Sequence, residues 1–272
     1  MFDPMHTAPR PDSDALAAQR AQARKRLNRA WFAFLMAGVA SMAAMFWALQ
    51  SQWESDQLKG WFLVTALALF YELRIFKQAL PLMRLPDEEA LADRIDGGVA
   101  LTLAAGLGYA LLAGLLMVPQ PAGALGWLAT ALTLAALFAD AWAEKRVREG
   151  DALVGGGHLA REFRALGALV ITVVGIHYGK LPSWLLAVGF MEYLILFTAS
   201  WMARQGAKVS AVGIRTRTIF LLNYLAVAGA SMAPIFHPDV AAVISVMTGA
   251  VYGLMALRDW LKLSGAGREK AS

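Results

Sequence analysis

The chain has no cysteine and little charge for its length. The absence of cysteine among its 272 residues excludes disulfides, thiolate metal sites and cysteine nucleophiles. Charged residues make up 17% of the sequence and hydrophobic residues 58%, whereas soluble globular proteins are about a quarter charged. These proportions predict an all-α integral membrane protein.

The sequence also lacks the patterns typical of metal-binding and nucleic-acid-binding proteins. Its four histidines are scattered, without the spacing that would gather a metal ion. The net charge is +5, but the basic residues flank apolar segments and form no stripe interleaved with exposed aromatics. No Lys-Ser or Lys-Thr follows the three glycines at 155–157, so they indicate a flexible helix start rather than a phosphate loop. From the distribution of the basic residues we expect no nucleic-acid partner.

Apolar segments long enough to cross a bilayer, about 20 residues each, recur along the chain. If the N-terminus lies in the cytoplasm, the outer loops contain only Lys59 and Lys180 of the 25 Lys and Arg residues. This asymmetry predicts a multi-pass protein of the cell inner membrane with both termini in the cytoplasm. The eight predicted spans are 30–50, 60–80, 97–118, 123–143, 165–179, 182–203, 217–236 and 239–258.

Two of these spans are shorter than the others. Glu72, Arg74 and Lys77 limit the apolar part of the second span, and we expect the charged ends of both short spans to project from the bilayer. The fifth span is brief unless its helix begins earlier, near His158. Pairs of small residues such as Gly106 with Gly108 predict close helix packing, and five tryptophans are expected at the membrane interface: Trp31, Trp53, Trp61, Trp184 and Trp260.

Loop lengths and charge divide the chain into four parts. Residues 1–29 are predicted to be a cytoplasmic tail followed by a basic amphipathic helix on the membrane surface. Residues 30–82 form a transmembrane hairpin, and residues 83–264 form a six-span unit. An interfacial helix over 82–95 introduces that unit, with Pro86 at its start. Residues 265–272 form a C-terminal tail.

Charged residues crowd between two of the spans. Asp140 and Glu144 stand four residues apart, on one face of a helix at its cytoplasmic end. Arg161, Glu162 and Arg164 follow where the chain re-enters the membrane. Because ionisable groups at membrane depth are costly and tend to be functional or paired, this cluster is the candidate site.

The span from about Pro86 to Trp260, about two thirds of the chain, resembles the CDP-alcohol phosphatidyltransferases. These six-span membrane enzymes transfer a phosphatidyl or related group from a CDP-linked donor to an alcohol. The resemblance implies a six-helix core of that type behind the N-terminal hairpin. It is carried by the interfacial segment and by residues 101–103, 111–114, 126–129, 139–140, 162–167, 178–182, 215–217 and 257–260.

The family signature, D-x-x-D-G-x-x-A-R-x8-G-x3-D-x3-D, is only partly present. Its four Asp hold divalent metal, Mg²⁺ or Mn²⁺, that neutralises the diphosphate, and the last is thought to be the base. Here Asp140 fits the first position, and Ala143 and Glu144 stand where Asp-Gly is expected. With a one-residue slip, Ala160 and Arg164 align with the last two Asp. Three of the four implied metal ligands are therefore missing.

Other departures agree with a lost metal site. The family commonly carries an Asn and an Arg in the first core span, where this chain has Val99 and Ala105. Arg164 at the former metal position could pair with Asp140 or Glu144 and supply the positive charge of the ion. The sequence therefore predicts Arg164 within ion-pair distance of one of those carboxylates.

The resemblance leaves the activity open. The favoured interpretation is a member of this fold with impaired or lost catalysis, binding membrane lipids or a protein partner, as a homodimer or with a related protein. The alternative is an active transferase that binds a CDP-linked lipid and uses Mg²⁺ or Mn²⁺ on Asp140 and Glu144, with Glu162 and Asp151 completing the set. A small transporter is a second alternative, although the spans hold few mid-membrane polar residues. Possible phosphate or lipid contacts are Arg148, Arg164, Lys208, Arg215 and Arg217.

Overall fold

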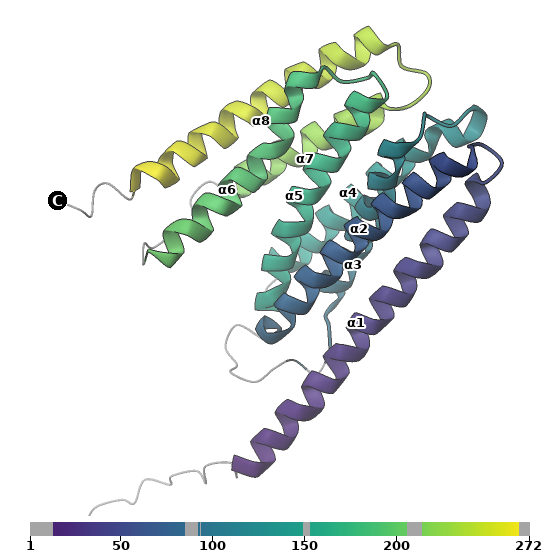
Figure 1. Cartoon of the computed structure of the whole chain (residues 1–272). Coiled ribbons are helices and arrows are strands. Elements are labelled where there is room, and N and C mark those ends of the chain that lie inside the picture. Colours follow the sequence, from purple (N-terminus) through teal and green to yellow (C-terminus); the bar gives the residue numbers. More distant parts are fainter. Residues whose placement is uncertain (1–12, 85–91, 93, 149–152, 206–213, 267–272) are drawn as a thin grey trace, which may run out of the picture.

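The computed structural model describes residues 13–84, 92, 94–148, 153–205 and 214–266. Within these residues the chain forms eight α-helices, joined in places by short 3-10 turns, and no strand (Figure 1). The all-α prediction is confirmed for this part of the chain. The helices are α1 (Ser13–Leu49), α2 (Ser55–Ala79), α3 (Gly97–Gly114), α4 (Leu128–Arg148), α5 (Val154–His177), α6 (Leu186–Arg204), α7 (Ile214–Ser231) and α8 (Pro238–Ala266).

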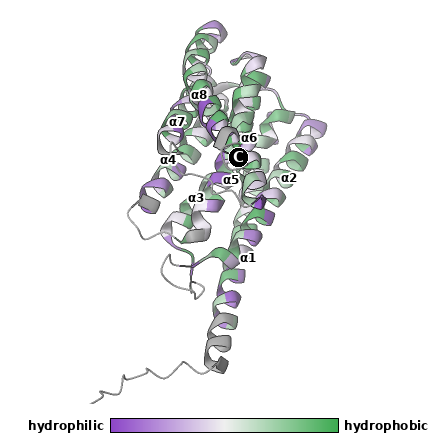
Figure 2. Ribbon diagram, turned by 90° about the vertical axis from the view of Figure 1, so that its left-hand side faces the viewer, coloured by the Kyte–Doolittle hydropathy of each residue, from purple (hydrophilic) through white to green (hydrophobic). Residues whose placement is uncertain are grey.

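The surface of the bundle is that of a membrane protein. In the described part of the chain, α1, α3, α4, α6 and α8 are each long and apolar enough to cross a bilayer. Figure 2 shows apolar residues along most of the helices. Large apolar side chains, among them Trp47, Phe70 and Phe197, lie exposed on the outside, where lipid rather than water would cover them.

The helix α3 lies at the centre of the packing. It contacts α2, α4 and α5, while α5 also contacts α6 and α7. The last helix, α8, packs against α6 and α7, and α1 packs mainly against α2 along one edge (Figure 1). The first two helices therefore form a hairpin that meets the remaining six through α2.

Small residues allow this close packing, as predicted. A Cβ atom on Gly106 of α3 would lie 2.4 Å from the ring of Phe163 on α5, and one on Gly114 would lie 2.6 Å from the indole of Trp61 on α2. Backbones this close leave no room for larger residues. Trp61 is fully buried in this contact, so the prediction that it anchors the membrane interface was wrong.

The start of α5 contacts the end of α2 and the start of α3. The Asp96 carboxylate accepts hydrogen bonds from the backbone N–H of Val99, at 2.6 Å, and of Leu153, at 2.9 Å. A Cβ atom on Gly155 would meet the Ala79 carbonyl oxygen at 2.9 Å. The glycines at 155–157 are thus helical and two of them are closely packed, and α5 begins well before the predicted span.

Of the two segments expected on the cytoplasmic side, one prediction needs correction and the other lies mostly outside the described residues. Residues 13–29 belong to the same continuous helix as the first span, and in Figure 1 the N-terminal part of α1 extends beyond the other helices. They are not a separate surface helix. The predicted interfacial helix over 82–95 falls mostly on residues outside the described ranges, and Arg84, Ala92 and Ile95 beside them are not helical.

Candidate functional site

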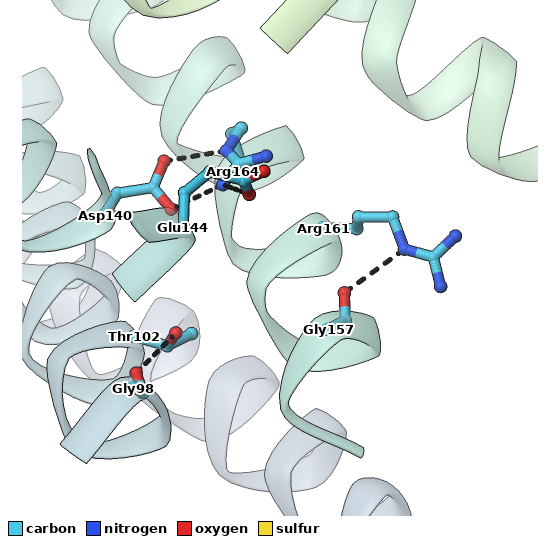
Figure 3. Close-up of polar contacts among 7 residues, drawn as sticks. All are labelled: Gly98, Thr102, Asp140, Glu144, Gly157, Arg161 and Arg164. Atoms are coloured by element: carbon cyan, nitrogen blue, oxygen red, sulfur yellow. Dashed lines mark hydrogen bonds and ion pairs between the residues drawn. The ribbon is translucent and has the colours of Figure 1, made fainter. Parts of the chain in front are cut away.

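The predicted ion pair between α4 and α5 is present. The Arg164 Nε atom donates to Asp140 Oδ2 at 2.7 Å, and Nη2 donates to Asp140 Oδ1 at 2.9 Å (Figure 3). Nη2 also donates to Glu144 Oε2 at 3.2 Å. The four-residue spacing on α4 places both carboxylates on the face that meets Arg164. The result is a bidentate pair with a third member, the geometry in which Arg–carboxylate bonds are strongest.

This cluster is largely shielded from solvent. Asp140 is 2% exposed and Arg164 is 5% exposed, while the Glu144 side chain is 20% exposed. A buried guanidinium without a partner would carry a large desolvation cost, and so would a buried Asp140 carboxylate. Each group therefore requires the other, and the pair locks α4 to α5.

The groups around the pair are mostly apolar or already bonded. Val99 and Ala105, where the suggested resemblance would place an Asn and an Arg, are each 1% exposed within the apolar core. The Thr102 hydroxyl donates to the Gly98 carbonyl oxygen of its own helix (Figure 3). The Tyr109 hydroxyl lies within electrostatic range of Asp140 and Arg164.

The residues present do not fit a divalent-metal site. In the described ranges no three His, Asp or Glu side chains gather where they could hold a metal ion. A two-metal clamp needs dense negative charge, yet Arg164 occupies both oxygens of Asp140. Glu162 is two residues from Arg164, which places it about 200° around the axis of α5. Its charge acts on Tyr71 and Tyr193. It therefore does not join Asp140 and Glu144 as the alternative transferase requires.

Several predicted site residues lie outside what the structure describes. Asp151 and Lys208 fall in undescribed segments. Arg148 and Arg215 lie at helix ends whose side chains are likewise outside the described part. Their predicted contacts with phosphate or lipid stay predictions.

Arg217, another predicted phosphate or lipid contact, belongs to a second buried network. Its Nε atom lies 3.1 Å from Glu192 Oε1 on α6, and its Nη1 atom lies 3.6 Å from Asp259 Oδ2 on α8. Tyr252 of α8 also donates to Glu192, at 2.9 Å. Arg217 is 8% exposed, so its charge is used within the bundle to join α6, α7 and α8.

Sequence reasoning missed Glu192 as a member of this network. It is the only charged residue between Leu186 and Ala203. An ionisable residue inside an apolar span is expected to face the bundle interior and to have a partner, so this signal could have found it.

Glu72 is a third buried acid and differs from the others. It was expected to project from the membrane, but its side chain is fully buried in α2. Both carboxyl oxygens have no hydrogen-bond partner in the described structure. Arg74 and Lys77, by contrast, are exposed. The prediction was wrong about Glu72, and the projection of Arg74 and Lys77 from the membrane stays a prediction.

Comparison of the chain with protein-family models, with curated proteins and with solved structures found no match. The chemistry of the site must therefore be judged from its geometry. In the described residues, Arg164, Asp140 and Glu144 form a buried ion-pair cluster that can hold two helices together. Among the described residues it presents no set of metal ligands.

Proposed function

We propose that this chain is a multi-pass membrane protein with a six-helix core of the CDP-alcohol phosphatidyltransferase type. In this proposal all eight helices cross the membrane, and an internal arginine has taken the place of the catalytic metal. The protein then binds membrane lipids without transferring their head groups. The proposed location is the inner membrane, with both termini in the cytoplasm.

The observation that carries this proposal is the bidentate bond between Arg164 and Asp140. A guanidinium in that position supplies the positive charge that a divalent ion would bring, and it repels such an ion from the same carboxylates. The apolar residues Val99 and Ala105 support the same interpretation, because they contribute nothing to binding a diphosphate.

A basic cavity supports the lipid-binding part of the proposal. Arg26 of α1 and Arg94, just before α3, line a cavity of about 480 Å³ together with Ala30 and Ile95. On α1 itself, no acidic residue occurs between Asp14 and Glu54. Arginine forks match the geometry of phosphate oxygens, and basic residues at the membrane surface attract anionic lipids.

The catalytic part can be tested with purified protein in lipid nanodiscs. Labelled CDP-diacylglycerol and mixed alcohols are supplied with Mg²⁺ or Mn²⁺, or with chelator, and CMP release is measured against a working transferase. We expect no metal-dependent CMP release. Release that needs metal and is lost in Asp140→Ala would establish the active-transferase alternative instead.

The replacement of metal by arginine has its own test. Arg164→Asp adds a third carboxylate beside Asp140 and Glu144, so Mn²⁺ binding followed by electron paramagnetic resonance should rise above the wild-type background. Arg161→Asp is the matched control, because Arg161 lies on the same helix, is exposed and points away from the pair (Figure 3). Mn²⁺ binding by the wild type at this cluster would contradict the proposal.

Lipid binding is tested separately, so that its failure leaves the catalytic result intact. Native mass spectrometry of the full chain with anionic and zwitterionic phospholipids should show selective retention of the anionic lipid. The double variant Arg26→Gln with Arg94→Gln should lose this selectivity. Arg24→Gln with Arg29→Gln removes the same total charge, both from α1 and outside the cavity lining, and should keep the selectivity. Equal loss in both double variants would point to general surface charge.

A further inference from the structure

The carboxyl group of Glu72 lies at the junction of three helices. It belongs to the face of α2 that packs against the rest of the bundle. A Cβ atom on Gly106 of α3 would lie 3.2 Å from Glu72 Cδ and 2.4 Å from the ring of Phe163 on α5. Glu72 is therefore enclosed by α2, α3 and α5 in well-packed structure, about two turns before the end of α2.

No hydrogen-bonding group of the described structure serves this carboxyl. Both of its oxygens are buried without a hydrogen-bond partner, and the buried Tyr109 hydroxyl on α3 is also unpartnered. An ionised carboxylate in such surroundings would lose its hydration and gain nothing in return. A buried acid of this kind takes up a proton instead of remaining charged.

The neighbouring charges do not change this conclusion. On α2 itself, Arg74 and Lys77 are exposed, and Tyr71 is the adjacent titratable group. On α3 the facing group is Tyr109, which lies within electrostatic range of Glu72, Asp140 and Arg164. On α5 the residue in contact is the apolar Phe163. The guanidinium of Arg164 is committed to Asp140 and Glu144 of α4, and Glu162 of α5, acting on Tyr71, adds only negative charge.

We propose that Glu72 is a proton-binding site inside the membrane and that its bound proton is required for the N-terminal hairpin to dock on the six-helix core. The ligand is a proton, held on one carboxyl oxygen. Loss of the proton would leave a bare negative charge between α2, α3 and α5, and this charge would be relieved only by separating α2 from its neighbours. The proposal holds whether or not the core has the proposed lipid-binding function.

The opposite behaviour of Glu192 makes the proposal specific. Glu192 is also buried in the bundle, but it accepts bonds from Arg217 and Tyr252, so a charge on it would be offset by a cation. The two glutamates are thus a matched pair, of which only Glu72 should carry a proton at neutral pH.

Infrared spectroscopy of the full chain in a detergent without ester groups tests this assignment. The carbonyl stretch of a protonated carboxylic acid, absent from carboxylates, should be present at neutral pH and should disappear in Glu72→Gln. It should persist in Glu192→Gln. If the wild type shows no such band, or if Glu192→Gln removes it, then Glu72 is ionised or bound to a cation and the proposal is wrong. Should Glu72→Gln not fold, carbon-13 labelling of glutamate in the wild type still decides whether a protonated glutamic acid is present.

Docking of the hairpin is tested by stability as a function of pH. The folded chain holds a proton on Glu72 that the unfolded chain releases at neutral pH, so wild-type stability should fall as pH rises. Glu72→Gln mimics the protonated acid and should remove this loss, while Glu192→Gln should retain it. An equal pH dependence in wild type and Glu72→Gln would overturn the docking role.

Discussion

Replacing Arg164 by Met provides the most direct test of the buried ion pair. The substitution removes the guanidinium and leaves a side chain of similar length. Asp140, which is 2% exposed, would then be a buried carboxylate without its two closest bonds, at 2.7 and 2.9 Å. Breaking a buried pair in this way costs about 3–5 kcal/mol of folding free energy.

The structure also supplies a surface pair for comparison. Lys59 lies 2.8 Å from Asp56, as close as Arg164 lies to Asp140, but the two side chains are 74% and 91% exposed. Water can solvate either partner when the other is removed. Lys59→Met should therefore leave stability almost unchanged, although the substitution and the bond length are closely matched.

The effect can be measured by unfolding in detergent. Reversible unfolding in mixed micelles with increasing dodecyl sulfate, followed by fluorescence of the nine tryptophans, reports the free energy of each variant. Arg164→Met should unfold at clearly lower denaturant than both the wild type and Lys59→Met. If the two substitutions have equal effects, the Arg164 bridge does not hold α4 to α5.

The double variant Arg164→Met with Asp140→Leu sharpens the test. Replacing both members of a buried pair by apolar residues is often neutral, or stabilising by about 1–4 kcal/mol. The remaining Glu144 side chain is 20% exposed and can be solvated. The double variant should therefore be more stable than Arg164→Met alone. A double variant less stable than the single one would refute the reasoning, because it would mean that the charges themselves stabilise the fold.

Three further substitutions test other contacts in the same assay. Gly106→Ala would place its Cβ atom 2.4 Å from the Phe163 ring and should destabilise the fold by about 1–3 kcal/mol. In the control Gly157→Ala the new Cβ atom meets nothing within 4 Å, so stability should be unchanged or higher. Equal effects of the two substitutions would exclude close packing as the cause. Arg217→Met should destabilise by about 3–5 kcal/mol, and a neutral result would mean that the second network is dispensable. Asp96→Ala removes the cap of α3 and the bond to the start of α5 and should cost about 1–2 kcal/mol; no change would show that neither bond stabilises the fold.

The positions of the helices followed from hydropathy and turn residues. Each of the eight predicted spans overlaps one of the α-helices found in the described residues. The boundaries were less accurate, since they depend on contacts. The helix α5 begins at Val154 because the Asp96 carboxylate receives the Leu153 N–H and because Gly155 fits against the end of α2. Neither contact is visible as a local pattern in the sequence.

The candidate site was also predictable only in part, because local spacing can be read from the sequence and contacts between distant residues cannot. Asp140 and Glu144 share a helix face through their spacing alone, and Arg164 was the cation expected to meet them. The buried side of a helix is harder to identify for a charge that stands near other charges at a helix end. Glu72 stands near charged residues at the end of α2 and was expected to project with them, yet its face meets α3 and α5. Glu192 lies alone in an apolar segment, a pattern that predicts a buried and paired acid, but nothing in the local sequence identifies Arg217 as its partner.

The buried acids Asp140, Glu192 and Glu72 show how the partner, rather than depth, determines the state of a carboxyl group in this bundle. Asp140 and Glu192 each face an arginine from a neighbouring helix, so desolvation is offset by a short charged bond. Glu72 is at least as deeply buried and faces Gly106 and Phe163. If its position served packing alone, an apolar residue would satisfy it at lower cost, because no described bond would be lost. A titratable group at the hairpin junction is therefore best explained by what it can bind, and the infrared comparison of Glu72→Gln with Glu192→Gln separates that explanation from simple packing.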